Sequence, residues 1–416
     1  MGVSQKLAMD KNILQAVEDL IIDKDDVWII SDGWKYLFKY NISKQRLETV
    51  VAFPKTIGTD YNAFSQIIKV ENEIYFIPLT ARDIYFCNLL EKEMYKIDVS
   101  FLPLPEVKNM SAIVSGKSIY CINRFPDMII KIDTVTKKIE VFDADISQYL
   151  DEDSERLVYR SYKKPCVDHE IIYWINCSNM LIKFDIKASC FSVQYIEGLP
   201  RDIIEPIETE GFKLRDWIIG VKIFEGVMFL FSMKGKIYKY DGRALGMKEE
   251  LFDNYCKFSS MDRIMIPVFY DLIPVNHSLY FIPSYKNDCI KYDSITKQFS
   301  KTLYSYTNEW EGNQRSYTFW KVINGKQILL YNFIESCFYL LDIEKNFIER
   351  KFLKLPIIGK ELVKENFAFA ERIVSYMGIN DNINILIGRL FNSSDSDDKR
   401  AKNHMDIGEK IYDSTI

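Results

Sequence analysis

Histidine and glycine are scarce in this sequence, and their scarcity limits the chemistry that the chain can support. The three histidines, His169, His277 and His404, are widely separated, so a Ser-His-Asp triad or a histidine-rich metal site has little material. The 17 glycines form neither GxGxxG nor GxxxxGKS/T, the two motifs whose backbones bind nucleotide phosphates. We therefore expect no metal and no cofactor, and we expect the histidines to occupy turns or the surface.

Long apolar runs and a local excess of basic residues are also missing. No stretch approaches the roughly 18 apolar residues of a membrane span, and residues 1–15 carry charges but no apolar core of a signal peptide. Acidic and basic residues are interspersed and give a net charge of −5, whereas a nucleic-acid-binding surface concentrates positive charge on one face. These absences predict a chain that neither inserts into membranes nor binds nucleic acid.

The eight cysteines form no CxxC pair. Several lie in apolar runs, where cysteine packs as a small hydrophobic residue. We expect all eight thiols to be free, which favours a reduced, cytoplasmic protein. The cysteines are Cys87, Cys121, Cys166, Cys177, Cys190, Cys256, Cys289 and Cys337.

Aromatic residues are abundant, and they recur in a repeat. The sequence has 26 tyrosines and 27 phenylalanines, which together with its β-branched residues favour an all-β fold. Seven short apolar runs, here named the marker runs, have second residues that lie 45 to 55 positions apart. The marker runs are residues 27–30, 74–77, 119–122, 172–175, 227–230, 279–282 and 328–331.

A second marker keeps the same register. An aspartate or asparagine follows the second residue of each marker run by 12 or 13 positions, where the next strand is expected to end. Its side chain can accept a hydrogen bond from the backbone two residues further on, so we interpret it as a turn residue rather than a calcium ligand. These closing residues are Asn41, Asn88, Asp133, Asp185, Asp241, Asp293 and Asp342.

Each repeat reads as four strands joined by short polar turns, which is typical of a β-propeller blade. The sequence therefore predicts an all-β fold, a seven-bladed β-propeller over residues 14–355 with a short helical C-terminal extension. An open ring would leave unpaired strand edges. We therefore expect residues 1–13 or the C-terminal tail to reinforce the junction between the first and last blades.

The pattern changes after residue 355. Residues 360–377 have apolar side chains at helical spacing and predict a helix, and residues 392–403 form a polar linker. The helix is expected either to dock on the propeller or to contact a partner, with residues 407–416 as a docking element beyond the linker. Residues 356–416 are thus predicted to be a separate helical segment and flexible tail.

The repeat resembles several known propeller families. Ile172-Tyr173-Trp174-Ile175-Asn176 is similar to the YWTD repeat of lipoprotein-receptor propellers, and the Lys-x-Asp strand end resembles kelch and NHL units. The paired glycines of kelch repeats and the Gly-His and Trp-Asp signatures of WD repeats are absent. The resemblance covers residues 14–353 and implies a propeller that binds ligands or partners. It carries over no catalytic residue.

Function in propellers lies mostly in loops at one end of the central channel, where connections before the first strands and between the second and third strands meet. Aromatic and arginine side chains there can stack on sugars or anchor peptides. They predict a binding or scaffold propeller for a glycan, a peptide or another protein, although Trp217 also suits packing between blades. The candidate binding residues are Trp34, Tyr61, Arg82, Arg124, Arg160, Tyr162, Trp217, Tyr285, Trp310 and Arg315.

An enzymatic alternative uses the same end of the channel. Acidic residues there, with arginines or tyrosines, would supply the general acid and base of a carbohydrate-active lyase or hydrolase. Two acids, or an acid and a tyrosine, converging on one point would favour the enzyme, whereas a broad aromatic and basic surface would favour the binding protein. The acids are Asp32, Asp127, Glu309 and Glu311, and their spacing does not bring two of them to the required separation.

Overall fold

The computed structural model describes residues 17–31, 34–54, 57, 63–104, 110–124, 127–144, 165–175, 180–196, 218–232, 235–240, 245–247, 269–283, 290–301, 319–323, 327–332, 337–342 and 347–352. The predicted C-terminal unit, residues 356–416, lies outside the described residues. The expected reinforcement of the ring junction by residues 1–13 or by the tail also falls outside them.

The described residues form seven antiparallel sheets, each built from four consecutive strands that pair in chain order. We number the sheets as blades one to seven along the chain. Blade one contains β1 (Val17–Asp23), β2 (Asp26–Ser31), β3 (Trp34–Asn41) and β4 (Arg46–Ala52). Blade two contains β5 (Phe64–Val70), β6 (Glu73–Pro78), β7 (Ile84–Asn88) and β8 (Glu93–Ile97).

The other five blades repeat this arrangement. Blade three holds β9 (Ser111–Ser115), β10 (Ser118–Arg124), β11 (Asp127–Asp133) and β12 (Ile139–Asp143), and blade four holds β13 (Cys166–Asp168), β14 (Ile171–Ile175), β15 (Met180–Asp185) and β16 (Cys190–Tyr195). Blade five holds β17 (Ile218–Phe224), β18 (Val227–Ser232), β19 (Ile237–Tyr240) and β20 (Leu245–Met247). Blade six holds β21 (Phe269–Val275), β22 (Ser278–Pro283), β23 (Ile290–Asp293) and β24 (Gln298–Lys301), and blade seven holds β25 (Phe319–Ile323), β26 (Gln327–Asn332), β27 (Cys337–Asp342) and β28 (Phe347–Phe352).

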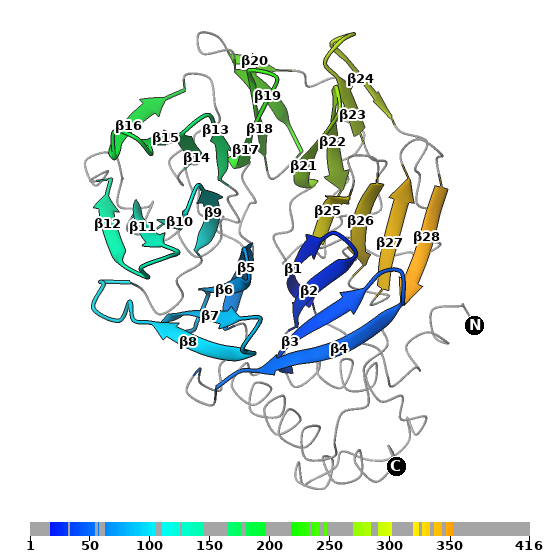
Figure 1. The fold of residues 1–416 in the computed structure, drawn as a ribbon. Helices are drawn as coiled ribbons and strands as arrows, with labels where there is room; N and C mark the ends of the chain where they lie inside the picture. The colour runs from blue at the N-terminus through cyan, green and yellow to red at the C-terminus, as the bar shows by residue number, and fades with distance from the viewer. Residues whose placement is uncertain are drawn as a thin grey trace, which may run out of the picture.

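The blades stand around a common axis, with the first strand of each blade nearest the axis and the fourth at the periphery (Figure 1). First strands of neighbouring blades contact one another from blade one to blade three and from blade four to blade seven, and β1 also contacts β25, so blade seven returns to blade one. Each marker run lies in the second strand of its blade. The fold is a β-propeller, which confirms the predicted all-β class.

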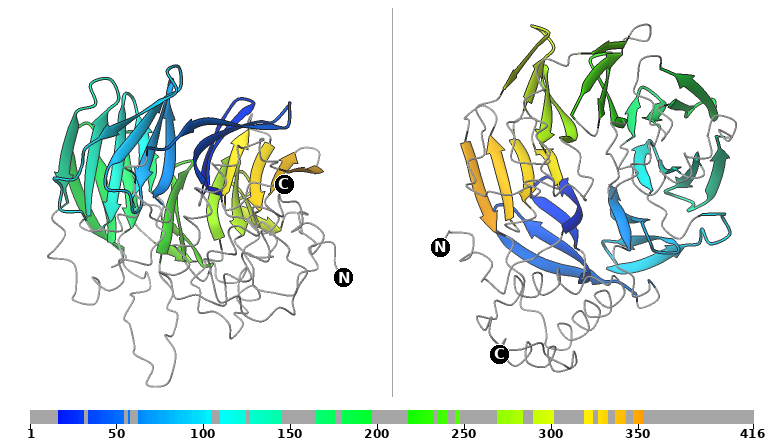
Figure 2. Two further views of the ribbon diagram at one scale, coloured as in Figure 1. Left: turned by 90° about the horizontal axis from the view of Figure 1, so that it is seen from below. Right: turned by 180° about the vertical axis from the view of Figure 1, so that it is seen from behind.

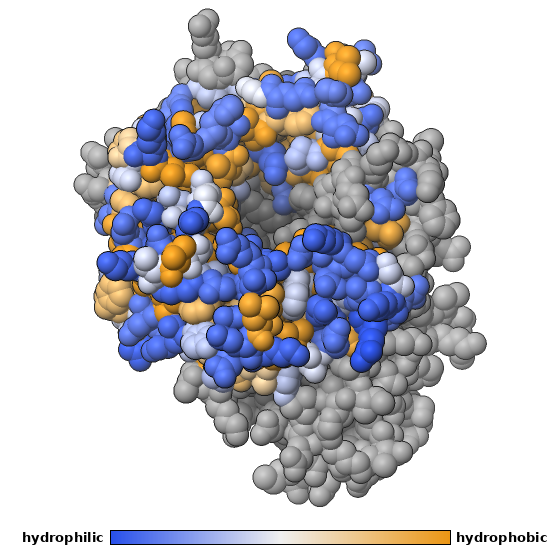
Figure 3. All heavy atoms as spheres, in the orientation of Figure 1, coloured by the Kyte–Doolittle hydropathy of each residue, from blue (hydrophilic) through white to orange (hydrophobic). Residues whose placement is uncertain are grey.

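The alternating strand direction sends the connections to two faces of the ring. Turns after the first and third strands share one face, the turn face, and connections after the second and fourth strands share the other, the rim face. Figure 2 shows the blades from the side, with the described turns gathered at one end of the strands. The turn face points toward the viewer in Figure 3, where it is mainly hydrophilic with separate apolar patches.

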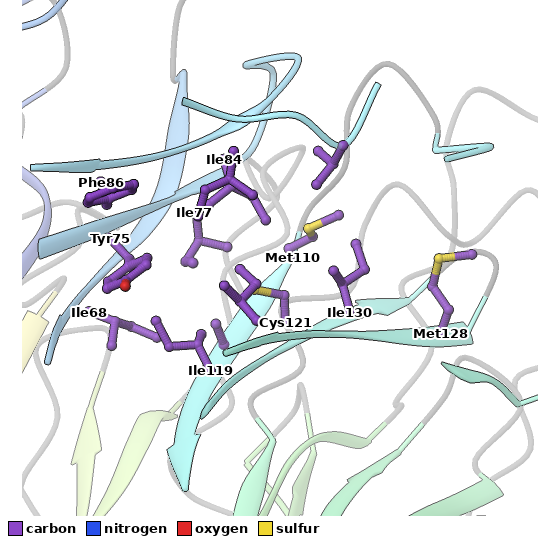
Figure 4. Close-up of a cluster of buried hydrophobic side chains, with 14 residues drawn as sticks. Ile68, Tyr75, Ile77, Ile84, Phe86, Met110, Ile119, Cys121, Met128 and Ile130 are labelled. Atoms are coloured by element: carbon purple, nitrogen blue, oxygen red, sulfur yellow. The ribbon is translucent and has the colours of Figure 1, made fainter. Parts of the chain in front are cut away.

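Apolar side chains fill the space between neighbouring blades. In the cluster between blades two and three, Tyr75, Ile77 and Phe86 of blade two pack with Ile119 and Cys121 of blade three (Figure 4). Comparable clusters are described between blades one and two, three and four, four and five, five and six, and seven and one. Each buried isoleucine or phenylalanine contributes roughly 1.5–3 kcal/mol, so these interfaces are the main source of stability.

Three cysteines belong to these interfaces. Cys87, Cys121 and Cys166 are buried free thiols, as predicted, and Cys190 is an exposed free thiol. Burial raises the pKa of the Cys87 thiol to about 11 and the pKa of the Cys121 and Cys166 thiols to about 12. The other four thiols lie outside the described side chains and stay a prediction: Cys177, Cys256, Cys289 and Cys337.

The closing residues form the predicted turns. In five blades the side-chain oxygen of the aspartate or asparagine accepts hydrogen bonds from backbone N–H groups two or three residues further on. For Asp133 the donors are Val135 at 2.9 Å and Thr136 at 2.7 Å. The turn role is thereby confirmed for Asn41, Asn88, Asp133, Asp185 and Asp293, while Asp241 lies outside the described residues.

One marker run is displaced by a residue. In blade two the first residue of the run, Ile74, pairs with the residue before the closing Asn88. In blade five the residue that pairs in this way is Met228 rather than Val227. The run that matches the register of blade two is therefore 228–231. The sequence did not show this because the apolar stretch of β18 begins one residue earlier, at Val227.

A bulge interrupts the first strand of blades one, two, five and six. In blades one and two the residue that follows the bulge joins one blade to the next. Asp19 of blade one accepts a hydrogen bond from the backbone N–H of Ile67 in blade two at 2.8 Å. Gln66, at the same place in blade two, bonds the backbone N–H and carbonyl of Ala112 in blade three at 2.8 and 3.0 Å.

Blade five has a glycine at the place of Asp19 and Gln66. The ring of Phe231 packs against Gly220, and a Cβ atom on residue 220 would lie 2.2 Å from its Cζ atom. Phe231 is 1% exposed and belongs to the cluster between blades five and six. At this position blade five therefore has no hydrogen-bonding side chain, and the buried ring of Phe231 fills the space instead.

A row of aromatic and lysine side chains also crosses most blades. The third residue of the second strand is aromatic in six blades, and in five of them its partner on the third strand is lysine. In blade one, Lys39 Nζ lies 5.7 Å from the ring centroid of Trp28 and 3.6 Å from Glu48 Oε1 on the fourth strand. We call this row the ladder, and in blade two it is Tyr75, Phe86 and Tyr95.

Substitution of Gly220 by alanine should destabilise the propeller by about 1–3 kcal/mol, because the core around Phe231 has no room for the methyl group. The measurement is the urea midpoint, read by tryptophan fluorescence. Gly116→Ala is the matched control, since no atom lies within 4 Å of the added Cβ and only the positive φ of 59° opposes it. Gly220→Ala should be less harmful in a Phe231→Leu background, and equal effects in both backgrounds would contradict the steric account.

The turn aspartates should make stability depend on acid. Hydrogen bonds from Thr136 to Asp133 and from Thr296 to Asp293 lower the pKa of both carboxyls below 3.8. A lowered folded-state pKa stabilises the fold above the unfolded pKa, and this contribution is lost as pH falls through the folded value. The double variant Asp133→Asn/Asp293→Asn keeps the acceptors without the charge. Its Tm should therefore drop less than the wild-type Tm between pH 6 and pH 3, and an equal drop would refute the assignment.

Candidate binding surface

The predicted binding residues are only partly within the described residues. Trp34 begins β3 and Arg124 ends β10, so their backbones lie at the rim face of blades one and three. Arg82, in the rim loop of blade two, is the one whose side chain is described. The others lie outside the described residues and stay predictions: Tyr61, Arg160, Tyr162, Trp217, Tyr285, Trp310 and Arg315.

Blade two presents two neighbouring rim loops, residues 79–83 between β6 and β7, and residues 98–104 after β8. Arg82 is exposed on the first loop. Phe101 is 68% exposed on the second loop. Sequence reasoning found Arg82 but missed Phe101, whose only signal was its place in a connection that leads to the next first strand.

A buried carboxylate ties the two loops together. Asp83 is 4% exposed, and its Oδ1 accepts a hydrogen bond from the backbone N–H of Val99 at 3.3 Å. Its Oδ2 lies 3.5 Å from Lys96 Nζ. The first loop is also anchored through Ala63, whose carbonyl accepts hydrogen bonds from the N–H groups of residues 79 and 81. The position of Arg82 relative to Phe101 is therefore fixed by the fold.

The second loop is held by its own turn and by the core. Asp98 accepts hydrogen bonds from the backbone and hydroxyl of Ser100 at 2.9 and 2.6 Å, and these bonds lower the pKa of the Asp98 carboxyl. Leu102 and Leu104 pack on the cluster between blades two and three. Phe101, between these anchors, remains in solvent.

Arg82 carries a charge that the described residues leave uncompensated. No hydrogen bond or ion pair joins its guanidinium to another side chain in the described ranges. Arginine and aromatic residues are the types that most often dominate the binding energy of protein interfaces. A rigid loop pair with an open arginine and an open phenylalanine therefore has the composition of an anchoring site.

The acids of the enzymatic alternative do not converge in the part of the chain that the structure describes. Asp32, Glu309 and Glu311 lie outside it, and of Asp127 only the backbone at the start of β11 is described. In blade two, the described rim carboxylates Asp83 and Asp98 both bind the backbone of the second loop. No specific observation favours catalysis at this surface.

The histidines have the predicted turn or surface roles where they are described. His169 and His277 lie in turns on the turn face, with side chains 95% and 67% exposed, and His404 is outside the described residues. Across the described ranges no group of three or more His, Cys, Asp and Glu side chains is placed to hold a metal ion. Those ranges also contain no helix long and apolar enough to cross a membrane.

Replacement of Asp83 by alanine should loosen the rim of blade two. The buried N–H of Val99 would lose its acceptor, which costs about 1–3 kcal/mol locally. Hydrogen exchange of residues 96–104 should accelerate by about tenfold or more, as measured by mass spectrometry. Asp185→Ala is the control because it breaks an equivalent exposed turn in blade four, outside residues 96–104. Unchanged exchange in Asp83→Ala would show that other contacts fix the loops.

No protein-family model matches this chain, and no curated protein matches it. Solved structures do. PorZ, a surface component of the type-IX secretion system of Porphyromonas gingivalis, matches with a TM-score of 0.51 and 10% identity over 84% of this chain, which spans only 39% of PorZ. BamB from Moraxella catarrhalis matches with a TM-score of 0.51 and 9% identity over 78% of this chain and 85% of BamB.

YCF48 bound to D1 peptide matches with a TM-score of 0.50 and 10% identity, over 76% of this chain and 90% of YCF48. At 9–10% identity these similarities show the fold alone. They agree with the observed sheets and ring order, and they identify the chain as a β-propeller protein.

Proposed function

We propose that this chain is a binding or scaffold propeller that holds a protein or peptide partner on its rim face. The observation that carries the proposal is the pair of exposed side chains, Phe101 and Arg82, on two loops that Asp83 fastens together. Such preorganised anchors lose little conformational entropy on binding. YCF48, a propeller of similar fold, has been solved with a peptide bound, so peptide recognition is compatible with this architecture.

The partner is expected to combine an apolar group with an acceptor for arginine. Phe101 supplies apolar contact area, and the guanidinium of Arg82 suits a carboxylate or phosphate with two parallel hydrogen bonds. Trp34 and Arg124, on the adjoining blades one and three, extend the proposed surface to both sides of blade two. The buried free thiols support a reducing, cytoplasmic setting, which we include in the proposal.

The test compares co-purification of partners by the tagged full-length protein and by its Arg82→Glu/Phe101→Ala variant. Removal of both anchors should reduce the recovered partner on the order of tenfold or more, because each anchor typically contributes above 1 kcal/mol. The recovered partner is then titrated against the purified proteins to obtain Kd directly.

Lys187→Glu/Ile295→Ala serves as the matched control, since it makes the same kinds of change at exposed positions of the turn face. Wild-type affinity in the rim variant with an unaltered Tm would overturn the proposal. Loss of binding to an oligosaccharide array in the same variant, with no protein partner, would assign the surface to glycans instead.

A further inference from the structure

Blade two departs from the aromatic and lysine ladder that blades one, three, four, five and six build. In blades one and three the ladder lysine is paired with a glutamate of the fourth strand, as Lys131 Nζ is with Glu140 Oε2 at 2.8 Å. In blade two the lysine place is taken by Phe86 and the outer place by Tyr95. No other blade has an aromatic residue at the outer place, where the residues are Glu48, Glu140, Ser192, Gly246, Ser300 and Glu349.

The three rings of blade two form a continuous stack. Tyr75 and Phe86 have centroids 5.5 Å apart at an interplanar angle of 26°, and Phe86 and Tyr95 have centroids 5.2 Å apart at 24°. Figure 4 shows the rings of Tyr75 and Phe86 lying over one another at the edge of the cluster. Tyr95, at the outer end of the stack, is 38% exposed.

The inner part of this stack already holds a cation. Lys137, from the turn after β11 in blade three, places its Nζ 4.4 Å from the Phe86 centroid and 5.1 Å from the Tyr75 centroid. The same Nζ lies 2.5 Å from Glu73 Oε2. Lysine over aromatic rings recurs between blades five and six, where Lys239 Nζ lies 3.8 Å from the Tyr292 centroid. In blades one and two, ammonium groups of this layer therefore lie against both ring faces and carboxylates.

The outer part of the stack lacks the cation. Tyr95 Oη lies 2.8 Å from Glu91 Oε2 and 3.0 Å from Glu93 Oε2. A phenol has one proton and donates to one carboxylate at a time, so the second carboxylate has no donor from this group. No lysine or arginine of the described residues forms an ion pair with Glu91 or Glu93.

The hydroxyl of Tyr95 is a fixed donor. Hydrogen bonds to Glu91 and Glu93 raise the pKa of the Tyr95 phenol, which therefore stays protonated over the whole physiological range. Leu90, in the same turn, is 76% exposed and adds an apolar contact beside the two carboxylates. An open ring, two acids and an adjacent leucine suit the ammonium or guanidinium head and the methylene stem of a basic side chain.

We propose that Tyr95, Glu91 and Glu93, on the outer edge of blade two, form a recognition site for a lysine or arginine side chain of a protein partner. The bound cation would lie beside an aromatic ring and a carboxylate, as Lys39 lies beside Trp28 and Glu48 in blade one. The site lies at the turn end of β8, away from the rim loops, and does not depend on the function proposed for them.

The probe is a fluorescein-labelled peptide of alternating lysine and serine, titrated with the full-length protein and followed by fluorescence anisotropy at low salt. Its neutral counterpart, with glutamine for lysine, should not bind. Glu91→Gln/Glu93→Gln should weaken the lysine peptide on the order of tenfold, and Tyr95→Ala by about three- to fivefold. Tyr95→Phe keeps the ring and both charges and should bind within about twofold of wild type.

The matched control is Glu48→Gln/Glu140→Gln, which removes the same net charge from ladder acids that already have lysine partners. This control and the rim variant Arg82→Glu/Phe101→Ala should bind the lysine peptide like wild type. If the ladder control weakened peptide binding as much as Glu91→Gln/Glu93→Gln does, the effect would come from the net negative charge of the protein. That result would overturn the proposal. Wild-type binding by folded Tyr95→Ala and by Glu91→Gln/Glu93→Gln would overturn it as well, without touching the rim function.

Discussion

The packing of each blade against its neighbours is the constraint on which the whole structure depends. A four-stranded sheet with two apolar faces cannot be stable alone in water. In the described residues, apolar side chains of neighbouring blades cover each other at six of the seven interfaces. The seam between the ends of the chain follows the same rule, because Leu20 and Tyr40 of blade one pack with Leu329, Tyr331 and Phe338 of blade seven. Ring closure in the described residues thus rests on side-chain packing, while every sheet keeps its own four strands.

This division between core and connections determines where binding can occur. The turn aspartates hold the turns within each blade, and the residues after the bulges of blades one and two hold one blade against the next, so these polar groups are already engaged. The side chains left for a partner are those that project beyond the strands, such as Arg82 and Phe101 at one end of blade two. Asp83 fixes the positions of the two loops that carry them. Its buried carboxylate is tolerated because it accepts a hydrogen bond from Val99 and lies next to the ammonium group of Lys96.

Sequence periodicity predicted the architecture because a propeller blade repeats both its apolar runs and its turn chemistry. Asp133 and its equivalents could be assigned before any coordinates, since an Asx turn is a local interaction. The displacement of the marker run at Met228 could not be predicted. In a uniformly apolar stretch, the residue that pairs with each position is not known until the neighbouring strand is placed. Phe101 and Tyr95 were not predicted as binding residues for a related reason. Their exposure and their cross-strand neighbours are properties of the assembled sheet, and neither residue lies in a recognisable motif.

The repeat itself provides the reference against which blade two stands out. Where five other blades place a lysine in the ladder, two of them opposite a glutamate, blade two uses Lys137 of its neighbour and leaves Tyr95 exposed. The borrowed lysine satisfies the inner rings, so packing alone gives no reason for an aromatic residue at the periphery. Tyr95 lies three residues before Asp98, where the rim loop after β8 begins, or about 10 Å along the strand. If both proposals hold, the two sites share no side chain, so a substitution in one site leaves the contacts of the other site in place.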